Sequence, residues 1–444
     1  MKHFYKLSLV LLLIILAVSC KEEDDFQVED DITSEVSEAT KKPNILLIIA
    51  DDMGLDATPG YSIGDLKPSM PTVENMMQNG ITFNNVWSNP TCSPTRATIL
   101  TGKYGFRTNV MKVDDALSTS EVSLQKYLDT QLNSEYNSAV IGKWHLSKDV
   151  NHPNNMGVNY YAGSIGGGLK NYWDWDLVIN GNTSPSTDYN TTKYTDLAID
   201  WVNSQTQPWF LWLAYNAPHT PFHLPPTNLH SQGELPTDET SINANPLPYY
   251  LASIEAMDSE IGRLLSEMSS EEKDNTVILF IGDNGTPNQV AQEYNSKKVK
   301  GSLYQGGINI PMIISGKNID RIGATEDALI NLTDLYATIS SIAGVKVSKI
   351  NDSYNFEELF SNSSESVRDY SYSETGANST SSDVTIRNLT HKYILFQDGD
   401  EALFNLNNDP LETKNLIHSR NLPLSEQDNL MKEELTAKLV NLKG

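Results

Sequence analysis

The feature that most constrains the fold of this chain is a set of short, continuous apolar runs. The first run, NILLIIA, covers residues 44–50, and four similar runs follow it along the chain. An uninterrupted apolar run of this length is typical of a strand that is buried on both faces, as in a parallel sheet. The predicted strands lie at residues 44–50, 139–142, 209–214, 276–281 and 310–315.

Helical patterns separate these runs. Apolar residues recur at helical spacing from Tyr249 to Met268, and the segments 72–79 and 331–343 show the same period. Strands that alternate with helices predict an α/β fold in which helices sandwich a large, mostly parallel sheet. After about residue 345, Ser, Asn and acidic residues dominate. Shorter strand-like pieces then predict a small C-terminal subdomain with an antiparallel sheet; they lie at 384–387 and 392–396.

Polar side chains directly follow two of the predicted strands. Asp51 and Asp52 come after the first run, and Asp283 and Asn284 come after the run that ends at residue 281. Ligands of α/β folds gather beyond the C-terminal ends of strands, and adjacent carboxylates repel each other unless a cation lies between them. Oxygen ligands of this kind favour Ca²⁺ or Mg²⁺ over Zn²⁺. Ordinary turns are the alternative for either pair alone, because Asp and Asn are common there.

The stretch PTCSPTRATILTG at residues 90–102 carries the most specific pattern in the chain. Pro94 is well placed to begin a helix, so we expect Cys92 just before a helix N-terminus, whose free N–H groups suit an anion. Arg96 adds a cation nearby, whereas the ordinary role of a lone cysteine is that of a small buried hydrophobe. The whole stretch resembles the Cys-x-Pro-x-Arg motif of the type I, formylglycine-dependent sulfatases of the alkaline phosphatase superfamily.

Four further segments resemble the same family in the same order, so that the resemblance covers about residues 43–416. One departure is Glu135, where the family usually has a glycine, and we expect only a local loop difference there. The segments are AVIGKWH at 139–145, NAPH at 216–219, KGSLYQGGINIP at 300–311 and LFNLNNDPLETKNL at 403–416.

The resemblance implies a sulfuric ester hydrolase that uses one Ca²⁺ ion and a modified cysteine. A maturation enzyme would oxidise Cys92 to formylglycine (3-oxoalanine), whose hydrated aldehyde supplies the nucleophile. Lys143 and Lys300 would clamp sulfate oxygens. His219, alone or with Lys300, would protonate the departing alcohol, and His145 would act as a base on the aldehyde hydrate. The implied catalytic residues are Cys92, Arg96, Lys143, His145, His219 and Lys300, and the implied calcium ligands are Asp51, Asp52, modified Cys92, Asp283 and Asn284.

The N-terminal segment is predicted to be a targeting signal and not part of the folded domain. Residues 1–19 combine early lysines with an apolar run of about a dozen residues, which predicts a signal peptide. Cys20 at its end resembles the lipidated cysteine of bacterial lipoproteins, which implies anchoring to the outer membrane, at the cell surface or in the periplasm. A plain signal peptide that discards Cys20 is the alternative. Beyond it we predict an acidic flexible linker at 20–42, a catalytic domain at 43–345 and the C-terminal subdomain at 346–444.

The amino-acid composition argues against one class of partner and excludes two structural classes. The formal net charge of −25 argues against general nucleic-acid binding, because such a surface repels phosphate backbones. Only two cysteines occur among 444 residues, which excludes a disulfide scaffold. A hydrophobic share of 39% suffices for a sizeable core and excludes wholesale disorder.

The expected substrate is a sulfated oligosaccharide or polysaccharide. Marine algal glycans (ulvan, carrageenan, fucoidan) and host glycosaminoglycans both stay open, and an algal glycan such as ulvan is favoured because an acidic surface suits saline water. Trp173 and Trp175 follow a run of three glycines and are candidates for stacking on sugar rings, with His223 as a further candidate. Packing of these aromatic residues onto the protein body is an equal alternative. Two other functions stay open from the sequence: a phosphodiester or phosphonate hydrolase of the same superfamily, and an inactive glycan-binding lipoprotein.

Overall fold

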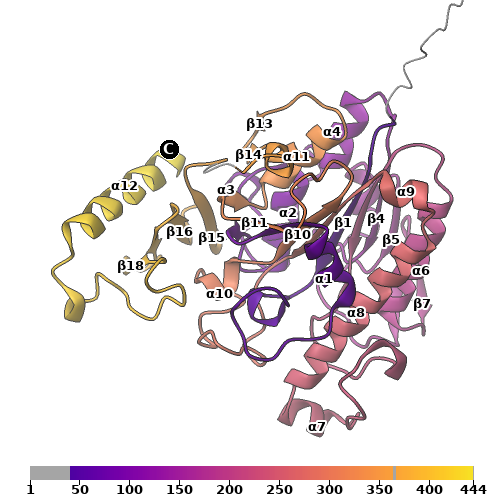
Figure 1. Ribbon diagram of the computed structural model, residues 1–444, viewed down its shortest axis with the longest axis horizontal. Coiled ribbons are helices and arrows are strands. Elements are labelled where there is room, and N and C mark those ends of the chain that lie inside the picture. The colour runs from indigo at the N-terminus through magenta and orange to yellow at the C-terminus, as the bar shows by residue number, and fades with distance from the viewer. Residues whose placement is uncertain (1–40, 364–366, 444) are drawn as a thin grey trace, which may run out of the picture. The chain divides into compact units, whose positions relative to one another are not determined.

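Within residues 41–363 and 367–443, which the computed structural model describes, a ten-stranded sheet forms the centre of the protein (Figure 1). Its strand order is β11-β2-β10-β9-β1-β8-β4-β5-β6-β7. The predicted signal peptide, Cys20 and the first part of the predicted linker lie outside the described residues. The strands are β1 Asn44–Ala50, β2 Gly80–Phe83, β4 Asn137–Gly142, β5 Tyr160–Gly163, β6 Trp175–Ile179, β7 Asn182–Ser186, β8 Trp209–Ala214, β9 Thr276–Gly282, β10 Met312–Gly316 and β11 Ala324–Glu326.

The five neighbouring strands β9, β1, β8, β4 and β5 are all parallel, so their C-terminal ends meet at one edge of the sheet. Four of them are runs predicted as strands from their apolar sequence. The fifth predicted run forms β10, which pairs antiparallel with both β9 and β2. An apolar run indicates that a strand is buried on both faces, but it does not indicate the direction of the strand. The antiparallel direction of β10 was therefore not predictable from the run itself.

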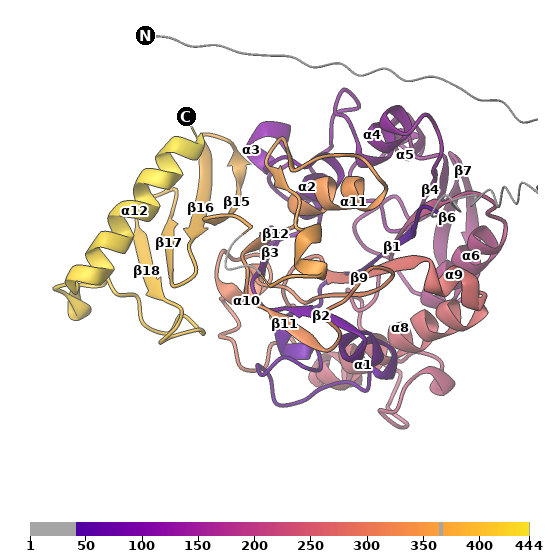
Figure 2. The same cartoon turned by 45° about the horizontal axis from the view of Figure 1, so that its top comes forward.

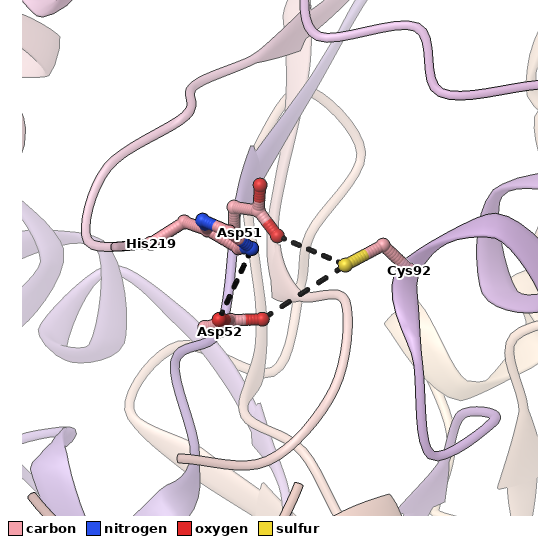
Figure 3. A group of neighbouring side chains, drawn as sticks. All are labelled: Asp51, Asp52, Cys92 and His219. Carbon is pink, nitrogen blue, oxygen red and sulfur yellow. Dashed lines mark hydrogen bonds and ion pairs between the residues drawn. The ribbon is translucent and has the colours of Figure 1, made fainter. Parts of the chain in front are cut away.

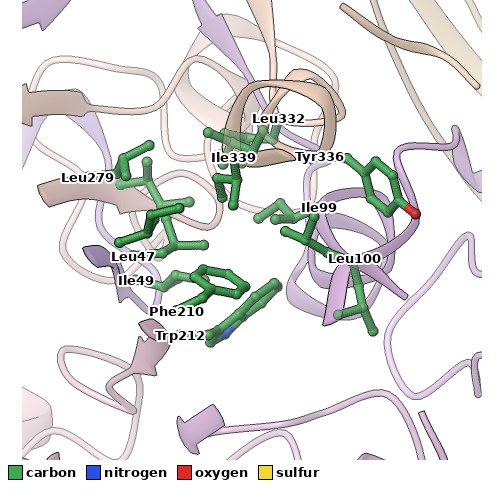
Figure 4. Packing of buried hydrophobic residues seen from close by; sticks show 14 of the residues in the cluster. Leu47, Ile49, Ile99, Leu100, Phe210, Trp212, Leu279, Leu332, Tyr336 and Ile339 are labelled. Atoms are coloured by element: carbon green, nitrogen blue, oxygen red, sulfur yellow. The ribbon is translucent and has the colours of Figure 1, made fainter. Parts of the chain in front are cut away.

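Side chains of β1 alternate between two hydrophobic cores, one on each face of the sheet. Leu47 and Ile49 face a core that includes Ile99 and Ile339, whereas Leu46 faces the other core. Figure 4 shows the first core, where sheet residues pack against α2 and α11. Helices α2 Cys92–Thr101, α4 Leu124–Gln131 and α11 Asp334–Ile342 cover this face, and α1 Pro71–Gln78, α6 Asn190–Asn203 and α8 Leu247–Glu267 cover the opposite face.

The C-terminal part of the chain forms a four-stranded antiparallel sheet with one long helix against it (Figure 2). Leu435 and Leu439 of the helix pack with Ile386 and Tyr393 of the sheet. The other side of this sheet contacts Trp87 and Ile308 of the main body. The elements are β15 Ser371–Asn378, β16 Ser381–Arg387, β17 His391–Leu395, β18 Glu401–Asn405 and α12 Glu426–Lys443.

This architecture confirms the predicted fold class, an α/β sandwich with a mostly parallel sheet and a small C-terminal antiparallel sheet. The domain limits at residues 345 and 346 stay a prediction. Among the described residues, no helix combines the length and the apolar character that a membrane crossing requires. The remaining short elements are β3 Val86–Trp87, β12 Ile330–Asn331, β13 Lys349–Ile350, β14 Ser353–Tyr354, α3 Gly105–Thr108, α5 His152–Asn155, α7 Glu239–Ala244, α9 Ser270–Asp274, α10 Gln305–Ile308, and the 3-10 helices η1 Leu55–Ala57, η2 Thr227–Leu229, η3 Glu357–Phe360 and η4 Ser419–Asn421.

Candidate active site

Three parallel strands deliver polar side chains to the same edge of the main sheet. Asp51 follows β1 directly and Asp283 follows β9, and the last residues of these two strands, Ala50 and Gly282, are register partners. Lys143 follows β4 in the same way, and its backbone N–H donates to the carbonyl of Ala214 at the end of β8. The site predicted from strand ends is therefore assembled by the register of the parallel strands.

Residues that follow β9 hydrogen-bond to Asp52 in the turn after β1. Asp52 has a φ of 68°, in the left-handed region, and its backbone N–H donates to Oδ1 of Asp283 at 3.0 Å. Asn284 donates through Nδ2 to Oδ1 of Asp52 at 2.8 Å. Neighbouring groups on β1 and β9 thus fix the direction of the Asp52 carboxylate.

Cys92 is the first residue of α2, and its side chain points from the helix N-terminus toward the two carboxylates (Figure 3). Its Sγ lies 3.3 Å from Oδ1 of Asp51 and 3.9 Å from Oδ1 of Asp52. The expected position just before the helix was wrong by one residue, because Thr91 rather than Cys92 is the N-cap. Burial, together with the charge of Asp51, raises the pKa of the Cys92 thiol well above its usual range. An unmodified thiol here would be a poor nucleophile.

Three cations surround this group. Arg96, one turn along α2, donates to Oδ2 of Asp283 at 3.0 Å and to the carbonyl of Lys143 at 2.8 Å. The ammonium of Lys143 pairs with Asp51, and that of Lys300 pairs with Asp52. Arg96 and Lys143 are completely buried, whereas the side chain of Lys300 is 22% exposed. Lys300 is therefore the most exposed of the three cations.

The electrostatics of the site are balanced between these groups. Burial opposes ionisation of Asp51, but Lys143 and its cationic neighbours hold the pKa of that carboxyl far below its usual range. For Asp283, burial and the nearby charge of Asp51 raise the pKa to about 7. The formal negative charges of the three carboxylates equal the formal positive charges of the three cations, so the site has no net formal charge. A bound divalent cation would leave the pocket positive, which suits a sulfate monoester with its single negative charge.

Two histidines flank the centre. His219 lies with Nε2 3.7 Å from Oδ2 of Asp52, and its Nδ1 is 2.7 Å from the carbonyl of Thr220. His145 has a φ of 57°, and its Nε2 lies 2.9 Å from Oδ1 of Asp114. Burial and the charge of Lys143 lower the pKa of His145 to about 3, so its ring is neutral at neutral pH.

A cluster of donor atoms in the site could hold a metal ion. Ligand atoms of Asp51, Asp52, Cys92 and His219 all lie within 4.8 Å of one another. Among the described residues, the buried Oδ1 of Asn284 has no hydrogen-bond partner, which leaves an amide oxygen free for a metal ion. The carboxylate of Asp283 instead contacts Arg96 and the backbone of Asp52, and His219 belongs to the group although it was not expected as a ligand. The ligand set inferred from the sequence stays a prediction.

The three residues proposed to contact sugar lie in different surroundings. Trp173 is half-buried, and Trp175 is buried on β6, where its indole N–H donates to the carbonyl of Asp188. His223 is buried beside Tyr172, with ring centroids 3.9 Å apart. Their role in substrate binding stays a prediction.

The structure also shows contacts of the candidate catalytic histidines that the sequence analysis did not predict. Asp114 contacts His145, and Tyr172 donates its hydroxyl to the carbonyl of His219 at 2.7 Å. A Cβ on Gly167 would lie 2.3 Å from the His145 ring. Asp114 and Tyr172 lie outside the matched motifs, and the glycine run gave only a general sign of a loop near a pocket.

Comparison with known proteins agrees with this geometry. The family model described as Sulfatase matches residues 43–345. The chain is 27% identical over 406 residues to the uncharacterized sulfatase YdeN of Escherichia coli (strain K12), covering 77% of this chain and 71% of that protein. It is 28% identical over 349 residues to N-acetylgalactosamine-6-sulfatase of Homo sapiens, covering 70% of this chain and 63% of that protein.

A solved structure shows that the likeness extends to the fold. The crystal structure of Ps i-CgsB in complex with k-i-k-neocarrahexaose superimposes with a TM-score of 0.77 at 25% identity, covering 91% of this chain and 93% of that chain. The matching family model, which covers more than half of the chain, and the shared fold lead to one conclusion: the chain is an enzyme of the sulfatase family.

Proposed function

We propose that the protein removes sulfate from a sulfated carbohydrate through a formylglycine made from Cys92. The observation that carries the proposal is the position of Cys92, with its side chain at the start of α2 and 3.3 Å from a carboxylate oxygen of Asp51. A nucleophile at this position would lie beside the cation-binding group and within a ring of three cationic side chains.

The proposed chemistry depends on what position 92 and the metal ion supply. Hydrated formylglycine supplies one hydroxyl that attacks sulfur and a second whose deprotonation later expels sulfate and restores the aldehyde. A Ca²⁺ ion held by Asp51, Asp52, Asp283, Asn284 and modified Cys92 would supply Lewis acidity at the sulfate oxygens. A serine or an intact thiol has no second hydroxyl, which is the physical reason for the modification.

The protein's own side chains perform the remaining tasks. Lys143 and Lys300 neutralise the sulfuryl oxygens, and Arg96 holds the side chain at position 92 and offsets the carboxylate charge. His219, partly exposed beside Asp52, donates a proton to the departing alkoxide. His145, neutral and held by Asp114, accepts the proton of the second hydroxyl.

The carbohydrate and the location of the enzyme are finer parts of the proposal. A marine algal polysaccharide such as ulvan is the proposed substrate, supported by the strongly acidic composition and by a similar structure that binds a neocarrahexaose. Lipidation of Cys20 would anchor the enzyme to the outer membrane, at the cell surface or in the periplasm. A Cys20→Ser variant that stays in the membrane fraction of the native host would contradict the anchor.

Two measurements test the proposed reaction. Mass spectrometry of the peptide that contains Cys92, from protein made in the native host, distinguishes the aldehyde from the thiol. Initial rates on an aryl sulfate and on its phosphate and phosphonate analogues rank the candidate reactions. We expect mass spectrometry to show the aldehyde at position 92. We expect the initial rate to be highest on the aryl sulfate, and a folded Cys92→Ala variant to show no turnover. An intact thiol would favour an inactive glycan-binding protein, and faster phosphate or phosphonate turnover would favour the superfamily alternative.

A further inference from the structure

A cavity of about 720 Å³ lies beside the active site and has no part in the proposed chemistry. We call it the aromatic pocket, because Tyr172, Trp173, Phe222 and His223 contribute to its lining. Its volume lies within the range of about 300–1,000 Å³ that is usual for ligand pockets. The cavity is therefore large enough to be a binding site rather than a packing defect.

The aromatic pocket begins beside His219, the residue proposed to protonate the departing alcohol. Thr220, the next residue in the chain, lines the pocket. The hydroxyl of Tyr172 donates to the carbonyls of His219 at 2.7 Å and Asn216 at 2.9 Å, so the pocket wall and the acid are held together. Atoms of the substrate attached to the sulfate ester oxygen would extend toward this cavity.

The aromatic wall of the pocket is rigid and uncharged. Trp173 packs on Tyr189 with ring centroids 4.9 Å apart and meets the His223 ring edge-on at 5.3 Å. The Tyr189 hydroxyl lies 3.0 Å from Nε2 of His223, and burial lowers the pKa of His223 to about 4. Trp173 itself is half-buried, so part of its ring surface is accessible. A ligand that stacks here would find the platform already ordered.

Polar side chains complete the lining of the aromatic pocket. Asn171, Asn243 and Gln289 offer amide donors and acceptors, Lys170 adds a cation and Glu239 adds an anion. A pyranose ring has the matching chemistry, because its C–H face suits the electron-rich face of an aromatic ring and its hydroxyls suit amides. On the basis of the proposed function, we propose that the aromatic pocket binds a sugar ring of the substrate's alcohol part, with Trp173 as the stacking platform.

Binding by a turnover-inactive protein tests this assignment separately from catalysis. In a Cys92→Ala background, tryptophan fluorescence and calorimetry would follow titration with ulvan, carrageenan, fucoidan, chondroitin sulfate and heparan sulfate oligosaccharides. We expect at least one of them to bind, with an affinity about tenfold weaker after Trp173→Ala and largely restored in Trp173→Phe. Trp201→Ala is the matched control, because Trp201 packs against Trp209 and does not line the pocket. If no oligosaccharide shows binding that depends on Trp173, the proposal is overturned.

Kinetics separate this proposal from the proposed reaction. In the modified enzyme, Trp173→Ala should raise KM for the bound oligosaccharide by about tenfold, and by clearly less for p-nitrophenyl sulfate. Equal losses on both substrates would contradict a sugar-binding role and indicate damage to the active site. Oligosaccharide binding without any sulfate release from either substrate by the wild type would instead overturn the proposed reaction and leave the pocket assignment standing.

Discussion

Arg96 and Asp283 form an ion pair that is completely enclosed, with a guanidinium nitrogen 3.0 Å from Oδ2 of the carboxylate and both side chains 0% exposed. The same guanidinium donates to the carbonyl of Lys143. One side chain therefore ties the start of α2 to the ends of β9 and β4. The pair links the stability of the protein to the geometry of its active site.

Replacing Arg96 with methionine should destabilise the protein strongly. The variant leaves a buried carboxylate without its partner, and loss of one member of a buried pair costs about 3–5 kcal/mol in the free energy of unfolding. Chemical denaturation followed by circular dichroism measures the change. Arg107→Met is the matched control, because Arg107 is 43% exposed in its pair with Asp352 and an exposed pair contributes about 0–1 kcal/mol. Equal losses in the free energy of unfolding of the two variants would show that the buried pair stabilises the protein no more than the exposed pair does.

Removal of a carboxylate at the end of β9 should weaken metal retention. In the wild type, the carboxylate of Asp283 accepts the backbone N–H of Asp52. Asp283→Asn removes this negative charge beside Asp52 and so disturbs the proposed calcium ligands. Elemental analysis after dialysis should show less bound Ca²⁺ than in the wild type. Asp129→Asn changes an exposed aspartate on α4 by the same atoms and should retain the full content. A full calcium content in Asp283→Asn would argue against a part for Asp283 in the metal site.

Gly167 should be essential for the position of the His145 ring. A Cβ at residue 167 would lie 2.3 Å from that ring, whereas a Cβ at Gly166 would meet only the carbonyl oxygen of Gly168, at 3.9 Å. Displacement of a catalytic group by about 1 Å can reduce turnover by about 10²-fold. We therefore expect Gly167→Ala to lower kcat on p-nitrophenyl sulfate by about that factor, with Gly166→Ala close to wild type. Similar rates for the two variants would contradict a close packing role for this loop.

Asp258 should make stability depend on pH in a predictable direction. It accepts the backbone N–H groups of Thr72 and Val73 at the start of α1, and burial raises its pKa to about 6 from an ordinary value near 3.9. Because the folded-state pKa is raised, this contribution to stability is complete below about pH 4 and is lost as the pH rises through about 6.

The free energy of unfolding, measured by urea denaturation from pH 4 to pH 7, tests this sign. Asp258→Asn cannot ionise, so its stability should lack the decrease of roughly 1–3 kcal/mol that the wild type shows across this range. A constant offset between the two proteins is expected, because an amide accepts fewer hydrogen bonds than a carboxylate. Parallel pH profiles would show that Asp258 keeps an ordinary pKa.

The local sequence was sufficient for four of the five strands of the parallel core and for the candidate nucleophile. The strands β1, β4, β8 and β9 are buried on both faces, and a strand buried in this way consists of a nearly continuous run of apolar residues. The motif around Cys92 also indicated a helix N-terminus, with an error of one residue. Such features depend on neighbours in the chain, so they can be read from a short stretch.

Only the tertiary structure decided which distant side chains meet. The direction of β10, the approach of His219 to Asp52, the contact of Asp114 with His145 and the different burial of Trp173 and Trp175 all depend on packing between segments far apart in the sequence. By itself the sequence determined the type of fold and the family motifs, because periodicity and motif spacing are local properties. The orientation of carboxylates, cations and rings is set by strand register and loop packing, which are non-local, and these relations give the site its chemistry.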